Sequence, residues 1–306
     1  GDLALHFADL VTRLDSVADD AVVLAAALTS QRAVSGEACV DLSKVAGTMV
    51  LADEDESGIL APDLESWLVA LRGSSLVGRD DTYRPLVLEN DRRLYLYRYR
   101  NLEDRLATAL RRRAEAPEFA VDLERLEQLL SVFFPIAVGA IDQRAAATLA
   151  VRRPFAVIGG GPGTGKTTTV VRVLALLQQL DAVAPERVAL AAPTGKAAVR
   201  LSEAVAQGAD MPELAGVALP QGAATVHRLL GLRGGGRPPN YGPDNLLPCD
   251  VLVVDEASML DLALMVQLIE ALPPRARLIL LGDSDQLASI EAGAVLGDIS
   301  AASKSK

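Results

Sequence analysis

The stretch FAVIGGGPGTGKTTTVVRVLALL, residues 155–177, joins an apolar run to a glycine-rich turn and then to a second apolar run that opens with lysine and threonine. The first run is typical of a buried strand and the second of a helix. Residues 160–167 between them match the pattern G-x-x-x-x-G-K-[ST], which holds nucleotide phosphates when it connects a strand to a helix. The stretch therefore predicts a nucleotide-binding α/β domain.

Each residue type in this loop has a chemical reason to be there. Glycines let backbone N–H groups converge on phosphate oxygens, and the positive end of the following helix faces the same anion. We expect Lys166 to reach the β- and γ-phosphates and the Thr167 hydroxyl to bind Mg²⁺. The residues expected to contact the nucleotide are Gly160, Gly161, Pro162, Gly163, Thr164, Gly165, Lys166, Thr167 and Thr168.

Strands and helices alternate along the C-terminal part of the chain. Short apolar runs at 154–158, 187–192, 250–254 and 276–281 are separated by segments with helical patterns. Such alternation predicts a doubly wound parallel sheet with helices on both faces. Runs without in/out alternation, such as VLVV and LILL, are typical of strands that are covered on both sides.

Acidic residues follow two of these strands. In VLVVDEASM, Asp255 is expected to hold Mg²⁺ at the end of a strand that neighbours the phosphate loop, and Glu256 to orient or deprotonate the attacking water. The next strand ends in GDSDQ, which makes Gln286 the candidate for sensing the γ-phosphate. Because the carboxyl ends of parallel strands share one edge of the sheet, these side chains are predicted to meet the phosphate loop there.

The N-terminal part has a different pattern. We expect residues 1–115 to form a mainly helical domain with a β-hairpin, and residues 116–306 to form the nucleotide-binding domain with a small exposed insertion at 231–248. The helix in APDLESWLVALRG is predicted to begin at Pro62. The hairpin is predicted to turn at Asn90 and Asp91, with Tyr95, Tyr97 and Tyr99 alternating onto one strand face.

The segment 92–113 is rich in arginine and tyrosine and leaves two interpretations open. It could be a stacking platform for single-stranded nucleic acid. It could instead be an edge strand and a helix whose arginines face solvent or a protein partner. We favour the second interpretation, because tyrosines and arginines would point to opposite faces of the strand.

Composition limits the function further. The formal net charge of −10 argues against a free-standing, non-specific nucleic-acid binder. The two cysteines, Cys39 and Cys249, belong to no metal or disulfide pattern. No apolar run approaches the length that spans a bilayer, so we expect a cytoplasmic protein without membrane contact.

The ordered set GGPGTGKT, AAPTGKAAVRL, TVHRLLG, VVDEASM and LLGDSDQLASIEAGAVLGD resembles motifs I, Ia, Ib, II and III of superfamily 1 DNA helicases. It is most similar to the superfamily 1B RecD subunits of RecBCD, or exodeoxyribonuclease V, enzymes. The resemblance implies a RecA-like P-loop NTPase fold and an ATP- and Mg²⁺-dependent 5′-to-3′ DNA helicase that acts in double-strand break repair and DNA end processing. It also implies RecB-like and RecC-like partner subunits, with the N-terminal domain docking on the RecC-like one.

Individual residues carry over by their place in these motifs. Gln143 resembles the family's adenine-contacting glutamine. Thr194, Lys196 and His227 match positions that contact single-stranded DNA. From the residues alone, Gln143 could equally open a helix, and a lone histidine such as His227 is more often a helix residue with ordinary partners.

The chain stops shortly after motif III. We expect that the family's second motor domain, with motifs IV to VI and the arginine finger, lies outside it, so that these 306 residues are part of a longer protein and hydrolyse ATP weakly or not at all alone. A stand-alone superfamily 1 helicase and an ATP-binding scaffold without turnover stay open as alternatives. A GTPase is disfavoured because no Asn-Lys-x-Asp sequence is present.

Overall fold

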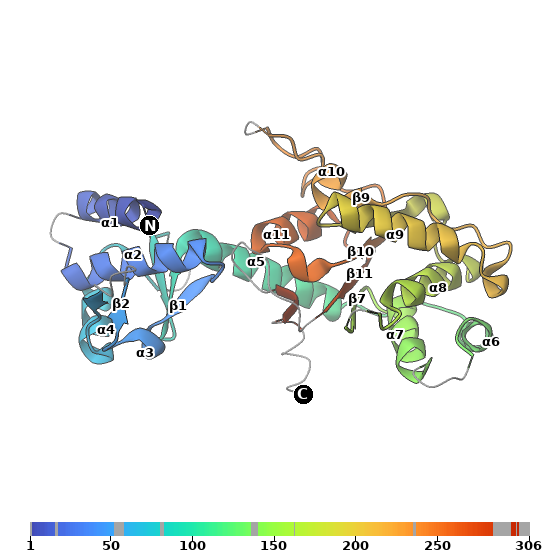
Figure 1. Cartoon of the computed structure of the whole chain (residues 1–306), viewed down its shortest axis with the longest axis horizontal. Helices are drawn as coiled ribbons and strands as arrows, with labels where there is room; N and C mark the ends of the chain where they lie inside the picture. The colour runs from blue at the N-terminus through green and yellow to red at the C-terminus, as the bar shows by residue number, and fades with distance from the viewer. Residues whose placement is uncertain are drawn as a thin grey trace. The chain divides into compact units, whose positions relative to one another are not determined.

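The computed structural model describes residues 2–15, 18–51, 58–79, 83–135, 140–161, 163–234, 237–283, 295–297 and 299 (Figure 1). The chain divides into two compact units, and the division falls between Arg105 and Leu106. Both of these residues belong to helix α5 (Tyr97–Ala114), so one continuous helix contributes to each unit.

The N-terminal unit combines helices with a small sheet of order β1-β6-β5-β4 and a separate β2-β3 hairpin. Its helices are α1 (Asp2–Leu14), α2 (Asp20–Val34), α3 (Leu42–Val45) and α4 (Leu64–Gly73), with the start of α5. Its strands are β1 (Cys39–Asp41), β2 (Met49–Val50), β3 (Ile59–Leu60), β4 (Val77–Gly78), β5 (Leu86–Glu89) and β6 (Arg93–Leu96). Trp67 is fully buried at its centre and donates its indole N–H to the carbonyl of Ala21 over 2.9 Å.

Helix starts in this unit follow the side-chain capping rules. Asp19 accepts a hydrogen bond from the backbone N–H of Ala21 and so caps the start of α2. Helix α4 begins after Asp63, whose side chain accepts from the N–H of Ser66. Pro62 therefore precedes the cap. The prediction that the helix begins at Pro62 is wrong.

The predicted hairpin is present, but its second strand is shorter than expected. Asn90 and Asp91 both have left-handed backbones, with φ of 48° and 51°, as a tight hairpin turn requires. Strand β6 ends at Leu96, and the next residues form the first turn of α5. The prediction that Tyr97 and Tyr99 continue the alternation of a strand is therefore wrong.

The arginines near this hairpin are engaged by carboxylates. Arg92 pairs with Asp41 over 2.7 Å, and Arg100 pairs with Glu89 over 3.1 Å. Tyr95 is only 2% exposed, and β6 lies between β1 and β5 and is not an edge strand. These contacts favour a structural role for the segment over a nucleic-acid stacking platform.

The C-terminal unit is built on a five-stranded parallel sheet of order β7-β11-β10-β8-β9. The strands are β7 (Phe155–Gly159), β8 (Val188–Ala192), β9 (Ala224–Thr225), β10 (Val251–Val254) and β11 (Arg277–Gly282). The helices are α6 (Leu123–Phe133), α7 (Ala140–Arg152), α8 (Lys166–Gln179), α9 (Gly195–Gly208), α10 (Val226–Leu230) and α11 (Leu262–Ala271), with the single turns η1 (Pro185–Arg187), η2 (Pro212–Leu214) and η3 (Ala257–Met259). The predicted parallel α/β sheet is confirmed.

Helices cover both faces of this sheet. Helices α7, α8 and α9 pack together over one face, and α10 and α11 lie over the other (Figure 1). This distribution follows from right-handed crossovers, because the connections from β7 to β9 run across the sheet in one direction and those from β9 to β11 return in the other. Strands β10 and β11 are buried along their whole length, which explains their continuous apolar sequences.

Two buried arginines stabilise the edge of the sheet where its strands begin. The Arg113 guanidinium, 6% exposed, donates to the carbonyls of Leu272, Pro273 and Ala276, just before β11. Arg277, the first residue of β11, stacks on the ring of Phe119 at 3.6 Å. The end of α5 is thereby part of the C-terminal unit.

The predicted insertion at 231–248 is mostly exposed where the structure describes it. Its ends are anchored, because the N–H groups of Asn240 and Tyr241 donate to the carbonyl of Leu230 and the N–H of Leu247 donates to that of Ala271. Within the described ranges, every helix is too short or too polar to cross a lipid bilayer.

Candidate functional site

The glycine-rich loop lies between β7 and α8, as the sequence predicts. Gly163 and Gly165 have φ of 76° and 82°, a conformation that costs side-chain-bearing residues about 1–2 kcal/mol. Gly165 caps α8 without a side-chain hydrogen bond, so the first N–H groups of this helix face the loop. The other helices that follow strands or loops at this edge begin at side chains that accept such a bond, namely Thr194, Thr225 and Asp261.

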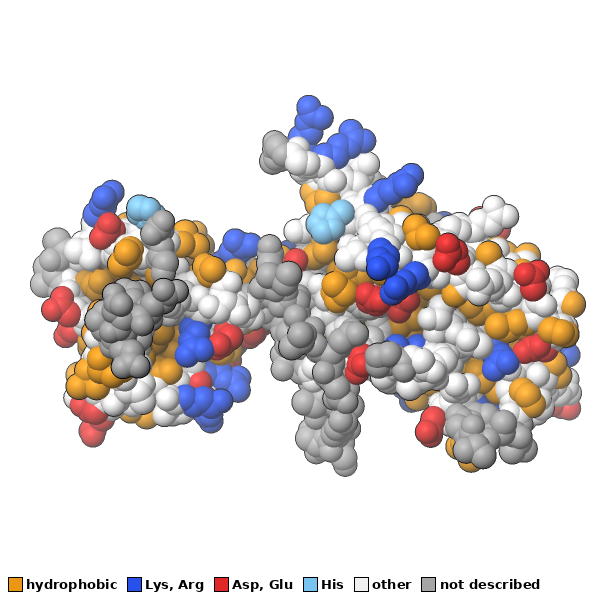
Figure 2. Space-filling view, in the orientation of Figure 1, with side chains coloured by type: hydrophobic (Ala, Val, Ile, Leu, Met, Phe, Trp, Pro, Cys, Tyr) orange, Lys and Arg blue, Asp and Glu red, His pale blue; other side chains and the backbone are white. Residues whose placement is uncertain are grey.

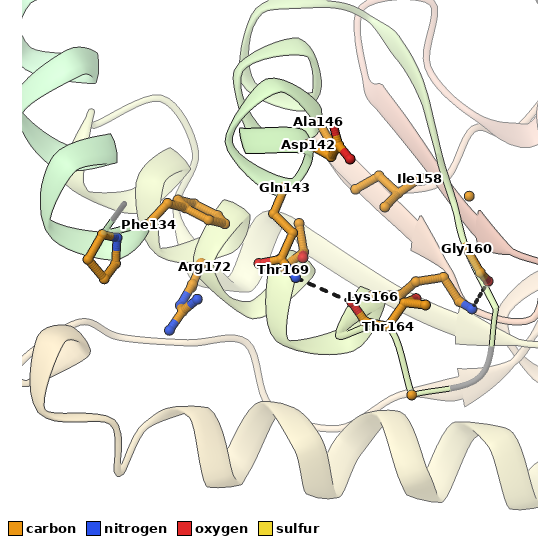
Figure 3. A pocket seen from close by; sticks show the side chains of 13 residues that line it. Phe134, Asp142, Gln143, Ala146, Ile158, Gly160, Thr164, Lys166, Thr169 and Arg172 are labelled. Atoms are coloured by element: carbon orange, nitrogen blue, oxygen red, sulfur yellow. Dashed lines mark hydrogen bonds between the residues drawn. The ribbon is translucent and has the colours of Figure 1, made fainter. Parts of the chain in front are cut away.

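Lys166 is directed into the same loop. Its Nζ donates to the carbonyl of Gly161 over 2.9 Å and also to that of Gly160 (Figure 3). Thr167 and Thr168 follow in the first turn of α8 and are half-buried. An ammonium and an uncapped helix N-terminus converge here, which is an arrangement that binds anions.

The two acidic candidates follow β10 directly. Burial raises the pKa of the Asp255 carboxyl, whereas its hydrogen bond from the backbone N–H of Glu256 and the charge of Lys166 lower it. Because β7, β11 and β10 are parallel, Asp255 and the phosphate loop follow strand ends at the same edge of the sheet. Strand β11 lies between β7 and β10, so the strand that carries Asp255 does not neighbour the phosphate-loop strand directly.

Glu256 has an unusual backbone. Its φ of 50° is left-handed, which is uncommon for a residue with a side chain and costs about 1 kcal/mol or more. The bond from its N–H to Asp255 Oδ1, 2.9 Å long, ties the two residues together. Leu51, Asn90, Asp91 and Asp181 share this backbone conformation, so the catalytic role of Glu256 stays a prediction. Pro162 and Gln286 lie outside the described residues.

The donor groups fit a magnesium ion that is shared with phosphates. Mg²⁺ is usually bound through one or two protein oxygens, with phosphates and water completing its shell. Thr167 and Asp255 supply a hydroxyl and a carboxylate of this kind. Among the described residues there is no cluster of three or more metal-ligating side chains, so a dedicated all-protein metal cage is not formed by them.

A cavity of about 650 Å³ extends from the phosphate loop toward the end of α6 (Figure 3). Lys166, Gly160, Gly163 and Thr164 line its phosphate end, and Gln143 on α7 donates to the carbonyl of Thr164 over 3.3 Å. The structure therefore brings Gln143 to the loop, as expected for a residue beside the nucleotide.

Two residues at the other end of this cavity were not identified from the sequence. Phe134 and Arg172 lie close together, with the guanidinium carbon 5.5 Å from the ring centroid (Figure 3). A signal for Arg172 was available, because Lys166, Thr169 and Arg172 are spaced three residues apart along one helix side. Phe134 gave no such signal, because it directly follows α6 and precedes the nucleotide-binding motif in the sequence.

The candidate DNA residues lie at the ends of β8 and β9. Thr194 begins α9, and its Oγ1 accepts from the N–H of Ala197 over 3.2 Å, which leaves its hydroxyl proton free to donate. Lys196 and His227 are exposed. Lys and Arg side chains gather on this face over α9, α10 and the 231–248 segment (Figure 2). The exposed basic residues of these segments are Lys196, Arg200, Arg228, Arg233 and Arg237.

Known proteins match both parts of the chain. Residues 1–95 match the N-terminal domain of the RecBCD enzyme subunit RecD, and residues 143–292 match an AAA domain. The chain is 44% identical over 312 residues to the RecBCD enzyme subunit RecD of Mycolicibacterium smegmatis, in a match that covers 96% of this chain and 51% of the relative.

Two other similar proteins are a RecD subunit and a RecD2 helicase. The RecBCD enzyme subunit RecD of Mycobacterium tuberculosis H37Rv is 43% identical, over 96% of this chain and 49% of the relative. The ATP-dependent RecD2 DNA helicase of Deinococcus radiodurans is 42% identical over 144 residues, which are 45% of this chain and 16% of that protein. The chain spans about half the length of these RecD subunits. Since the N-terminal domain of RecD subunits and an AAA domain are both matched, and in this order, the chain is similar to RecD subunits over about half of their length.

Proposed function

We propose that this chain is part of an ATP-driven, 5′-to-3′ DNA helicase or translocase subunit of a RecBCD-type complex. The complex would process DNA ends during double-strand break repair in the cytoplasm. The similar proteins support this assignment, because they are RecBCD enzyme subunits and an ATP-dependent DNA helicase. The observation that carries the proposal is the convergence of the phosphate loop and the Asp255–Glu256 pair on one edge of the sheet.

The residues at this edge can each supply a different part of ATP hydrolysis, from phosphate binding to activation of the attacking water. Lys166 and the N-terminus of α8 would bind the phosphates, and Gln143 would contact the adenine. Mg²⁺, held by Thr167 and Asp255, would offset phosphate charge. Glu256 would orient and deprotonate the attacking water, which is a contribution of about 10²- to 10⁴-fold in rate. Gln286 is proposed to sense the γ-phosphate.

Single-stranded DNA would cross the same unit over α9 and α10. Thr194 can donate its hydroxyl to a phosphate, and Lys196 and His227 lie exposed near the ends of neighbouring strands. The exposed arginines of α10 and the 231–248 segment extend this basic surface. A local basic path of this kind is compatible with the net charge of −10, because partner subunits would provide the rest of the channel.

The N-terminal unit is proposed to dock on a RecC-like subunit, with a RecB-like subunit completing the complex. The match of residues 1–95 to the RecD N-terminal domain supports this role.

The test is DNA-stimulated ATP hydrolysis by the intact protein in its complex. Glu256→Gln should retain ATP binding and reduce the hydrolysis rate at least about 100-fold. The matched control Glu203→Gln changes an exposed glutamate on α9 and should leave the rate within about twofold. Normal hydrolysis by the Glu256→Gln complex would refute the assignment, and loss of ATP binding would make Glu256 a structural residue.

A further inference from the structure

Arg172 lines the end of the cavity away from the phosphate loop and forms an ion pair with Glu213, which lies behind the lining residues. Arg172 donates from Nη2 to Oε1 of Glu213 over 2.8 Å, while its guanidinium contacts the ring of Phe134. Arg172 lies six residues beyond Lys166 on α8, which is about 9 Å along the helix axis. This separation is on the scale of the distance between the phosphates and the base of a nucleotide.

The Arg172 guanidinium still has hydrogen-bonding capacity. Its Nε is buried without a hydrogen-bond partner among the described residues, whereas 20% of the side chain is exposed, so a ligand in the cavity would meet the terminal Nη groups. Guanidinium groups carry five N–H donors and a flat face that stacks on aromatic rings. A planar base with acceptor nitrogens could use both features, whereas a sugar could not use the flat face.

Glu213 is well placed to fix this guanidinium. It belongs to the single turn η2, whose next residue, Leu214, is 1% exposed in the main core of the unit. The pKa of the Glu213 carboxyl is lowered by its own backbone N–H and by Arg172, so it is ionised at neutral pH. Without this anchor a long arginine side chain gains rotamer freedom and turns its charge toward water.

We propose that Glu213 is a positioning residue for the base of the bound nucleotide and acts by holding Arg172 against Phe134 at the end of the cavity. This inference rests on the proposed function, because it requires an adenine nucleotide whose phosphates lie at Lys166. Glu213 itself does not line the cavity in the described residues, so its effect on the base is indirect.

The experiment compares two ligands by calorimetric titration of the intact protein. Mg-ATP has both base and phosphates, whereas magnesium tripolyphosphate has the phosphates alone. Glu213→Gln should raise the Kd for ATP about tenfold, which corresponds to about 1.4 kcal/mol, and change the Kd for tripolyphosphate less than about twofold. Asp250→Asn is the control, because it breaks the exposed 2.7 Å pair with Arg187 and should change neither constant.

Two further variants make the test decisive. Arg172→Lys keeps the charge but loses the planar fork, so it should show the same ATP-selective loss even if Glu213→Gln fails to fold. The double variant Glu213→Gln/Arg172→Lys should be no weaker than Arg172→Lys alone, because the two residues act as one unit.

Other outcomes overturn the proposal. Unchanged ATP binding in Glu213→Gln, an equal loss for both ligands, or additive effects in the double variant would each show that Glu213 does not act through the base. Lys166→Met should weaken binding of both ligands, and if it weakens neither, the proposed function itself fails whatever Glu213→Gln does.

Discussion

Three consecutive arginines end α5, and the structure predicts very different effects when each is replaced by alanine. Arg111 and Arg112 are exposed, whereas Arg113 is 6% exposed. The Arg113 guanidinium makes hydrogen bonds of 2.9, 2.9 and 3.1 Å to backbone carbonyls that follow α11. No carboxylate pairs with it in these contacts, so its charge is balanced by carbonyl dipoles at the end of that helix.

The size of the effect follows from these contacts. A hydrogen bond from a charged donor contributes about 1.5 kcal/mol or more, so three bonds amount to about 4.5 kcal/mol. Burial disfavours the charged guanidinium and lowers its pKa, and the alanine variant regains part of that cost. We therefore expect Arg113→Ala to lower the free energy of unfolding by about 3 kcal/mol. For a unit of about 200 residues this is a decrease in Tm of about 6–12 °C.

Thermal unfolding of the three single variants checks the reasoning. Arg111→Ala and Arg112→Ala should each stay within about 0.5 kcal/mol of the unchanged protein. The positive charge of Arg112 disfavours the charged form of the Arg113 guanidinium. Any change in Tm for Arg112→Ala should therefore be a small increase. If Arg113→Ala melts within 2 °C of Arg112→Ala, the buried hydrogen bonds are not what holds the end of α5 to this unit.

Three other predictions concern the phosphate loop and its surroundings. Lys166→Met should weaken Mg-ATP binding about 10²- to 10⁴-fold in calorimetry, because two charge-assisted phosphate contacts are lost. The Tm of this variant should stay within about 2 °C of the unchanged protein, because the carbonyls of Gly160 and Gly161 that Lys166 contacts can bind water in its place. Asp255→Asn should raise Tm at pH 7 and leave it unchanged near pH 3. Burial raises the pKa of the Asp255 carboxyl in the folded state, so the free energy of unfolding falls as the pH rises from the ordinary aspartate pKa through the folded value. The asparagine variant does not titrate and should not show this loss. Gly208→Ala should cost about 1–3 kcal/mol in chemical denaturation, because the added Cβ would lie 2.3 Å from Val171 Cγ1, and Val171→Ala should restore most of it.

The sheet and the phosphate loop could be predicted from the sequence because their signals are local. Continuous apolar runs identify buried parallel strands, and the glycine spacing identifies the turn between β7 and α8. Strand order is not local, since it depends on which faces the crossover helices cover. The sequence therefore placed Asp255 at the end of a strand but did not reveal that β11 separates this strand from β7.

The base end of the cavity could not be assembled from motifs, because its residues come from distant segments. Phe134 directly follows α6, Arg172 lies in the middle of α8, and Glu213 belongs to a turn after α9. Only the tertiary packing brings the carboxylate of Glu213 to a guanidinium 41 residues earlier in the chain. Gln143 was found because the family resemblance supplied a signal that local patterns did not.

The error at Tyr97 has a local cause that the sequence did contain. Strand β6 pairs with β5 only up to Leu96, opposite Leu86, and the preceding residue of the partner strand is Pro85. Proline has no N–H to continue a ladder, although its carbonyl still accepts from the N–H of Tyr97 over 3.0 Å. The chain then turns into α5, where Arg100 and Asp104 pair within one helical turn.

The two ends of the parallel strands carry groups with opposite effects on the stability of the fold. At the edge where strands begin, charged groups such as Arg113 are buried with hydrogen-bond partners. At the other edge the fold retains unfavourable features: an uncapped α8, the left-handed backbone of Glu256 and a buried carboxyl at Asp255. Each costs stability in the free protein, and we expect a triphosphate with Mg²⁺ at the proposed site to offset the cost of the uncapped helix N-terminus and of the buried carboxyl. Ligand binding should stabilise this unit by mass action, with these costs already contained in the Kd, and substitutions that relieve one feature should stabilise the free protein while weakening its ligand binding.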